Sequence, residues 1–170
     1  MGKVHNLDDE TEFRDIGIID ANDVETIFKH YSSPLTTNGK TLIEEAIRGK
    51  INPALLVAII QKECSYGVKA NNKSLDERNI ANPFSIHFRT KDQLEEGEQP
   101  KDMLRPSKGV LPTFRQSASA AVNTLDHWKS KGNGALPFSA VAAYYSEKPD
   151  IWKKDVMQYY LHILFLLKKK

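Results

Sequence analysis

Glu63 is the residue whose type and position best fit a chemical role. It follows Ile59 and Ile60 by four and three residues, so helical geometry stacks it on an apolar stripe. It also falls in the last turn of that helix, where unpaired carbonyl groups disfavour another negative charge. Both effects raise the pKa of a carboxyl group, and a protonated carboxylic acid is what glycosidic bond cleavage requires. The alternative is that Glu63 turns outward and pairs with Lys62 or Lys69.

The helix that carries Glu63 has clear boundaries in the sequence. Asn52 is a good N-cap, and Pro53 occupies the first helical position, where its missing N–H is not needed. The run 55–60 is apolar on nearly every side, which predicts a central, buried helix. Gly67 can take the left-handed conformation that ends a helix.

The rest of the chain predicts a mainly α fold. Apolar residues recur at helical spacing in five further segments: 22–31, 40–50, 117–131, 137–145 and 149–167. The segment of about 68–112 lacks this period and predicts a functional lobe, in which the alternation of Phe84, Ile86 and Phe88 indicates a short strand. Residues 1–18 have few apolar positions and predict a polar arm, which leaves 19–170 as one domain.

An ordered set of short motifs resembles a known family. Its elements are S-P-L at 33–35, I-N-P-A-L-L-V-A-I-I-Q-K-E-C-S-Y-G at 51–67, N-P-F-S-I at 82–86, A-Y-Y-S at 143–146, and the spacing of Trp152, Val156, Tyr159 and Tyr160. Together they are similar to the bacterial and phage peptidoglycan N-acetylglucosaminidases, a glucosaminidase family of the lysozyme-like superfamily. The resemblance covers roughly residues 30–165. It implies a lysozyme-like helical domain with a small β-containing lobe after the catalytic helix.

The resemblance also implies roles for individual residues. Glu63 would be the general acid, and Tyr144 or Tyr145 would stand beside it to place sugar or a catalytic water. One of these two must be buried, because consecutive helical residues cannot both face a cleft. Asn82 and Phe84 would shape the cleft floor, although Phe84 fits a core anchor equally well. Where the family has serine after the glutamate, this chain has cysteine.

A second carboxylate would come from the lobe, or be replaced by the substrate's own acetamido group. The acidic residues of the lobe are Asp92, Glu95, Glu96, Glu98 and Asp102. We favour Glu96 or Glu98; the alternative is that all five are solvated surface charges. Trp152 is interpreted as a core residue.

Other chemistries find little support. The formal charge of +2 is too small to indicate nucleic acid, and no metal-ligand spacing or cofactor fingerprint occurs, so neither a metal nor a cofactor is expected. Cys64 with His87 could form a cysteine peptidase pair, but such a nucleophile usually lies at a helix start, and Cys64 lies at a helix end.

The expected substrate is the glycan backbone of peptidoglycan, cut as an endo-β-N-acetylglucosaminidase would cut it. The alternatives are a lytic transglycosylase with 1,6-anhydro products and a non-catalytic wall-binding or structural module. The acidic N-terminus lacks the pattern of a secretory signal, and 161–167 is too short to span a bilayer. We therefore expect delivery to the wall by a phage, a secretion machine or a leader that the sequence lacks.

Overall fold

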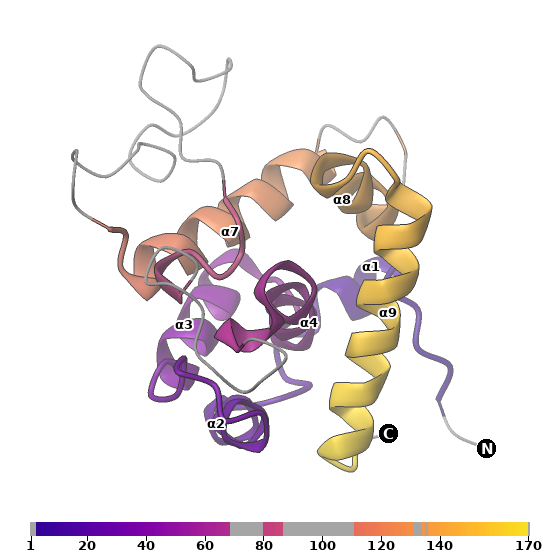
Figure 1. Ribbon diagram of the computed structural model, residues 1–170. Helices are drawn as coiled ribbons and strands as arrows, with labels where there is room; N and C mark the ends of the chain where they lie inside the picture. The colour runs from indigo at the N-terminus through magenta and orange to yellow at the C-terminus, as the bar shows by residue number, and fades with distance from the viewer. Residues whose placement is uncertain (1–2, 69–79, 87–110, 131–133, 135, 170) are drawn as a thin grey trace.

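The computed structural model describes residues 3–68, 80–86, 111–130, 134 and 136–169, of which 127–130 are described by their backbone. Within these ranges the helical elements are α1 (Glu10–Phe13), α2 (Ala21–His30), α3 (Gly39–Gly49), α4 (Pro53–Cys64), η1 (Ser65–Gly67), α7 (Phe114–Ser130), α8 (Pro137–Tyr145) and α9 (Pro149–Leu166) (Figure 1). The described ranges contain no β-strand. The predicted mainly α class is therefore confirmed.

Local sequence explains where most helices begin. Asp20 and Asp23 form a reciprocal capping box at the start of α2, and Pro137 and Pro149 occupy the first positions of α8 and α9. Each predicted helix is confirmed, with small shifts of its boundaries. The short α1 was not predicted; it begins after Asp9, whose side chain accepts two backbone N–H groups.

The strand prediction is wrong for residues 84–86. Here the side chain of Asn82 bonds both the carbonyl oxygen (2.8 Å) and the N–H (3.1 Å) of Ile86, which closes a turn. Phe84 and Ile86 are both buried, while Ser85 is exposed with a φ of 52°. The alternation of apolar residues thus reflects a turn that buries two side chains. Phe88, the third residue of the pattern, lies outside the described residues.

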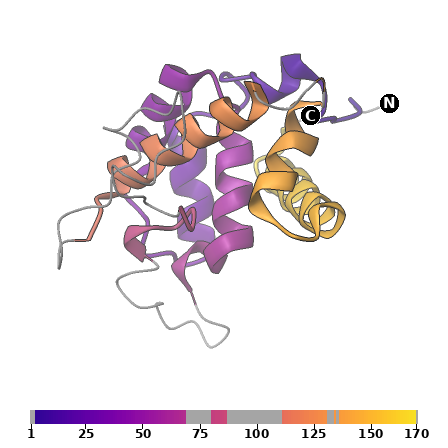
Figure 2. The same cartoon turned by 90° about the horizontal axis from the view of Figure 1, so that it is seen from above.

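Helix α4 is the centre of the molecule. Figures 1 and 2 show it between α3 and α7 on one side and α9 on the other. Every side chain from Ala54 to Ile60 has a relative exposure of 0%, as the continuous apolar run predicted. Helix α9 packs antiparallel to α4, because Tyr160 contacts Asn52 at one end while Asp155 pairs with Lys62 at the other.

The polar arm predicted for residues 1–18 does not match the packing of its described part. Leu7 and Phe13 are completely buried in the main hydrophobic cluster. Asp8 accepts hydrogen bonds from the N–H and hydroxyl of Ser139, both 3.1 Å, and pairs with Lys153 at 2.6 Å. The N-terminal segment therefore contacts both α8 and α9 and connects them. Leu7 and Phe13 lie where the segment crosses the core, and Asp8 and Asp9 accept N–H groups at the starts of α8 and α1.

A buried polar cluster closes the N-terminal end of α4. Asn52 accepts the N–H of Ala54 (2.9 Å) and donates to the carbonyl of Glu12 (2.9 Å) and the hydroxyl of Tyr160 (3.1 Å). The carboxylate of Glu12 accepts hydrogen bonds from Tyr160, from the ring of His5 and from a backbone N–H. Because all these groups are withdrawn from water, each needs the others as partners.

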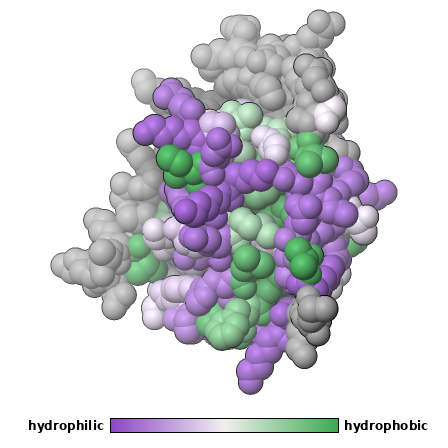
Figure 3. Space-filling view, turned by 90° about the vertical axis from the view of Figure 1, so that its right-hand side faces the viewer, coloured by the Kyte–Doolittle hydropathy of each residue, from purple (hydrophilic) through white to green (hydrophobic). Residues whose placement is uncertain are grey.

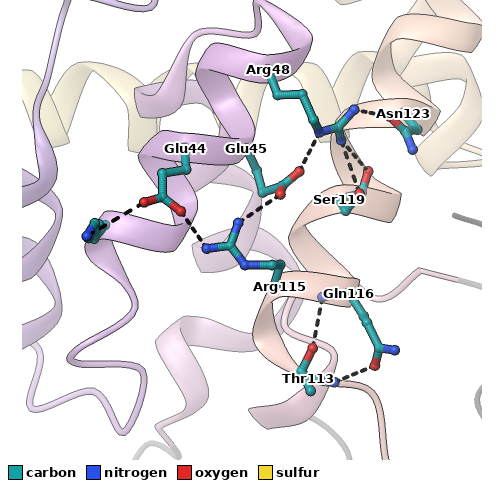
Figure 4. A network of polar contacts seen from close by, with 9 residues as sticks. Glu44, Glu45, Arg48, Thr113, Arg115, Gln116, Ser119 and Asn123 are labelled. Carbon is teal, nitrogen blue, oxygen red and sulfur yellow. Dashed lines mark hydrogen bonds and ion pairs between the residues drawn. The ribbon is translucent and has the colours of Figure 1, made fainter.

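Helices α3 and α7 are joined by a charged network (Figure 4). Arg115 pairs with Glu44 and Glu45, and Arg48 bonds Glu45 (2.7 Å) and Asn123 (3.0 Å). The two arginines are about half exposed, so this network orients α7 more than it stabilises the fold.

The α9 side of the molecule carries some exposed apolar residues. Ile151, Leu161 and Phe165 have relative exposures of 55%, 43% and 76%. Figure 3 shows hydrophobic atoms on this face interspersed with hydrophilic ones. Among the described helices, none combines the length and the apolar character that crossing a bilayer demands.

We predict that Asn52→Ala lowers the free energy of unfolding by about 2–4 kcal/mol, because a helix cap is lost and buried groups lose their partner. Urea denaturation measures this. The matched control is Asn38→Ala at the N-cap of α3, where the side chain makes no capping bond. Its cost should stay below about 1 kcal/mol. Equal losses in the two variants would contradict the role of Asn52.

Acid should weaken the fold through Glu12. Burial alone would raise the pKa of Glu12, but hydrogen bonds from His5, Asn6 and Tyr160 and the attraction of His5 outweigh it, so the pKa is lowered from its ordinary 4.5. The resulting stabilisation is present above pH 4.5 and is lost as the pH falls through the lower, folded-state pKa. Between pH 5 and pH 3, Glu12→Gln should therefore lose less stability than the wild type. Parallel pH profiles of the melting temperature would contradict this.

Candidate functional site

Glu63 lies half-buried in the last turn of α4, as predicted. Its Oε1 accepts a hydrogen bond of 3.0 Å from the indole Nε1 of Trp152 on α9. The alternative partner Lys62 instead binds Asp155 at 2.6 Å, and Lys69 lies outside the described residues. The carboxyl group is thus directed toward α9. The predicted rise of its pKa stays a prediction.

Aromatic rings surround the contact between Glu63 and Trp152. Tyr145 stacks on the indole with ring centroids 5.0 Å apart and planes 12° apart, and Phe138 lies 6.0 Å from it at 52°. Tyr144 meets Tyr145 edge-on at 5.3 Å. The structure therefore brings Tyr145, one of the two predicted tyrosines, beside the indole that binds Glu63.

The hydroxyl of Tyr145 is buried and has no hydrogen-bond partner. Burial raises the pKa of Tyr145 well above its usual value, and interactions with Tyr144 and Glu63 act in the same direction. The hydroxyl is therefore a neutral donor at physiological pH. Glu63 at the end of α4 and Tyr145 at the end of α8 both contact Trp152, so the aromatic rings hold in place a carboxyl group that can donate a proton.

The chain after Glu63 takes an unusual backbone conformation. Ser65, Tyr66 and Gly67 have φ values of 50°, 57° and 75°, all in the left-handed region. The sequence predicts this conformation for Gly67 and not for the two residues before it. Left-handed backbone is unfavourable for residues with a side chain, so other contacts must hold this turn.

Three sets of contacts hold the turn. The hydroxyl of Ser33 donates to the carbonyl of Tyr66 at 2.5 Å, and Tyr66 donates to Gln61 at 2.8 Å. The ring of Tyr66 is buried against Phe28 and stacks on Tyr31 with centroids 4.7 Å apart. A Cβ at Gly67 would lie 3.0 Å from a side-chain carbon of Pro34. The motif at 33–35 therefore positions the end of the helix that carries Glu63.

Asn82 and Phe84 make internal contacts. The amide of Asn82 is engaged by Ile86, and Phe84 is completely buried with its ring 6.2 Å from that of Phe114. The carbonyl of Ala81 accepts a hydrogen bond from Ser117 at 2.6 Å, which fixes the turn to α7. The structure thus shows packing contacts for both residues. Their predicted part in binding substrate stays a prediction.

The remaining predicted site residues belong to the segment after α4. Glu96, Glu98 and the other acidic residues of the lobe lie outside the described residues, as does His87. Across the part of the chain that the structure describes, no group of three or more His, Cys, Asp or Glu side chains could hold a metal ion.

Cys64 is a poor nucleophile. It is 6% exposed, and burial raises the pKa of its thiol to about 11, although backbone N–H groups of Gly67 and Tyr66 act in the opposite direction. Glu63 adds a small further rise. A thiol with this pKa carries almost no thiolate at neutral pH, which argues against a cysteine peptidase.

Comparison with known proteins adds nothing to this site, since no family model, curated protein or solved structure matches the chain.

The sequence did not predict the contact of Glu63 with Trp152, because an apolar stripe predicts only that the indole is buried. A usable signal did exist. The N–H of a buried tryptophan normally requires an acceptor, and an antiparallel α4–α9 pair places Glu63 within reach.

We predict that Cys64 resists alkylation in the folded protein. With a pKa of about 11, roughly one thiol in a thousand is ionised at pH 8, so iodoacetamide should react at least about 100-fold more slowly than with unfolded protein. The rate should rise about tenfold per pH unit up to pH 10. Mass spectrometry of the modified chain measures both. Complete labelling within minutes at pH 8 would contradict the assignment and revive the nucleophile hypothesis.

Proposed function

We propose that this chain is a lysozyme-like glycoside hydrolase that cuts the glycan strands of peptidoglycan, with Glu63 as its general acid. The observation that carries the proposal is the placement of Glu63. A half-buried carboxyl group in the last turn of the central helix accepts an indole N–H at 3.0 Å, and the ring of Tyr145 stacks on that indole. The motif order described above supplies the substrate class.

The proposed reaction begins with transfer of the Glu63 proton to the glycosidic oxygen. The bond between that oxygen and the anomeric carbon then breaks, and positive charge develops on the sugar ring. Glu96 or Glu98, or the acetamido group of the substrate, stabilises this charge. Water then attacks the anomeric carbon, and one proton of that water passes to a carboxylate of the site. The products are two shorter glycan fragments.

The surroundings of Glu63 support the acid role on physical grounds. The side chain extends from a helix that is fully buried from Ala54 to Ile60, and it lies in the last turn, where the helix carbonyls point. Tyr145 is neutral at physiological pH and adds no further charge beside Glu63. The proposed enzyme acts on its substrate at the bacterial cell wall.

We predict that Glu63→Gln lowers the rate of wall lysis by roughly 10²- to 10⁴-fold, because the amide cannot protonate the leaving oxygen. The melting temperature should change little. Turbidity loss of purified cell walls measures the activity. The control is Glu147→Gln, which makes the same change at an exposed position close to α8. Full clearance by the Glu63 variant would refute the proposed acid.

Mass spectrometry of the released fragments tests the reaction type. Hydrolysis by an N-acetylglucosaminidase leaves a reducing N-acetylglucosamine end, whereas a lytic transglycosylase leaves a 1,6-anhydro sugar. If the wild type binds cell walls but releases no fragment, the result would contradict an enzyme and support a wall-binding module.

A further inference from the structure

We propose that Trp152 is the positioning residue of Glu63. The indole N–H of Trp152 holds one carboxyl oxygen of Glu63 and thereby directs the acidic proton to the other oxygen. This inference rests on the proposed function of Glu63. It concerns a residue that the sequence assigns only to the core. Trp152 acts through Glu63 and does not itself meet the substrate.

The position of the indole is fixed by its neighbours. Trp152 is 3% exposed, with Tyr145 stacked on it and Phe138 packed against it at 52°. The ion pair of Lys62 with Asp155, one helical turn further along α9, fixes the spacing of the two helices beside it. Because the ring cannot rotate in this packing, its N–H points toward Glu63 before any ligand binds.

The hydrogen bond distinguishes the two oxygens of Glu63. An indole nitrogen is a donor only, so the Oε1 atom, 3.0 Å away, must accept. In the neutral acid the proton therefore resides on Oε2, the oxygen turned away from the indole. A fixed donor thus selects the oxygen that delivers the proton, and misplacement of a catalytic group by about 1 Å can cost about 10² in rate.

The same hydrogen bond affects the protonation of Glu63. A hydrogen bond donated to the carboxylate favours its charged form, so removal of the N–H shifts the titration of Glu63 to higher pH. The other groups near Glu63 differ in their behaviour. Cys64 and Tyr145 stay protonated, because burial raises their pKa values, and Lys62 is paired with Asp155. Asp155 is the other carboxyl group of this set, and its variant therefore serves as a control below.

The kinetic test is Trp152→Phe, which keeps an aromatic ring and removes the N–H. On soluble glycan fragments we expect kcat to fall about tenfold or more, KM to change less than about twofold, and the basic limb of the pH profile to move upward. The matched control is Trp128→Phe, the same change at the only other tryptophan. Unchanged kcat and pH profile in a folded Trp152→Phe protein would overturn the proposal.

The second test needs no activity. In the Trp128→Phe background, Trp152 is the only tryptophan, and its fluorescence should follow the ionisation of the carboxyl group that it binds. We expect a single titration between about pH 3 and pH 8, which persists in Asp155→Asn and disappears in Glu63→Gln. A titration that persists in Glu63→Gln would overturn the contact.

The two tests separate the positioning role from the proposed function. If the wild type releases no glycan fragments but the fluorescence titration depends on Glu63, the function fails and the contact stands, without a catalytic role. If Glu63→Gln abolishes lysis while Trp152→Phe matches the wild type, the function stands and the positioning role fails.

Discussion

The complete burial of α4 from Ala54 to Ile60 is the constraint on which the rest of the structure depends. A helix surrounded by protein cannot satisfy its end groups with water, so other side chains must satisfy them. At the N-terminal end this is done by Asn52 with Glu12 and Tyr160. At the C-terminal end the chain turns through left-handed residues held by Ser33. Both ends therefore recruit segments that are distant in sequence, and the cluster at the N-terminal end also joins α9 to α4 through Tyr160.

This constraint explains why the N-terminal segment belongs to the domain. Glu12 contributes its carbonyl to Asn52 and its carboxylate to Tyr160, so α1 completes the polar cluster that α4 requires. Asp8 continues the connection to Ser139 and Lys153 at the starts of α8 and α9. These two helices carry Tyr145 and Trp152 beside Glu63. The geometry of the candidate site at one end of α4 thus depends on contacts made by the first residues of the chain.

The sequence predicted features that follow from local rules and missed those that depend on tertiary contacts. Asn52, Pro53 and the apolar run after them specified α4 correctly, because capping, proline geometry and periodicity act within a few residues. The strand expected at Phe84 failed, since alternation cannot distinguish a strand from a turn that buries two side chains. The burial of Glu12 was not predictable either, because its partners His5 and Tyr160 meet only in the folded chain.

Trp152 shows how a core position can carry information about a site. Hydrophobic periodicity treats tryptophan as an apolar residue, and its 3% exposure agrees with that treatment. Its N–H is nevertheless a polar group that burial leaves in need of an acceptor. Phenylalanine or leucine could fill similar space without that need. The tryptophan therefore adds a requirement that packing alone does not impose, and Glu63 is the residue that meets it. A buried tryptophan that faces the end of a neighbouring helix accordingly predicts a polar acceptor there, even when every other residue of its stripe is apolar.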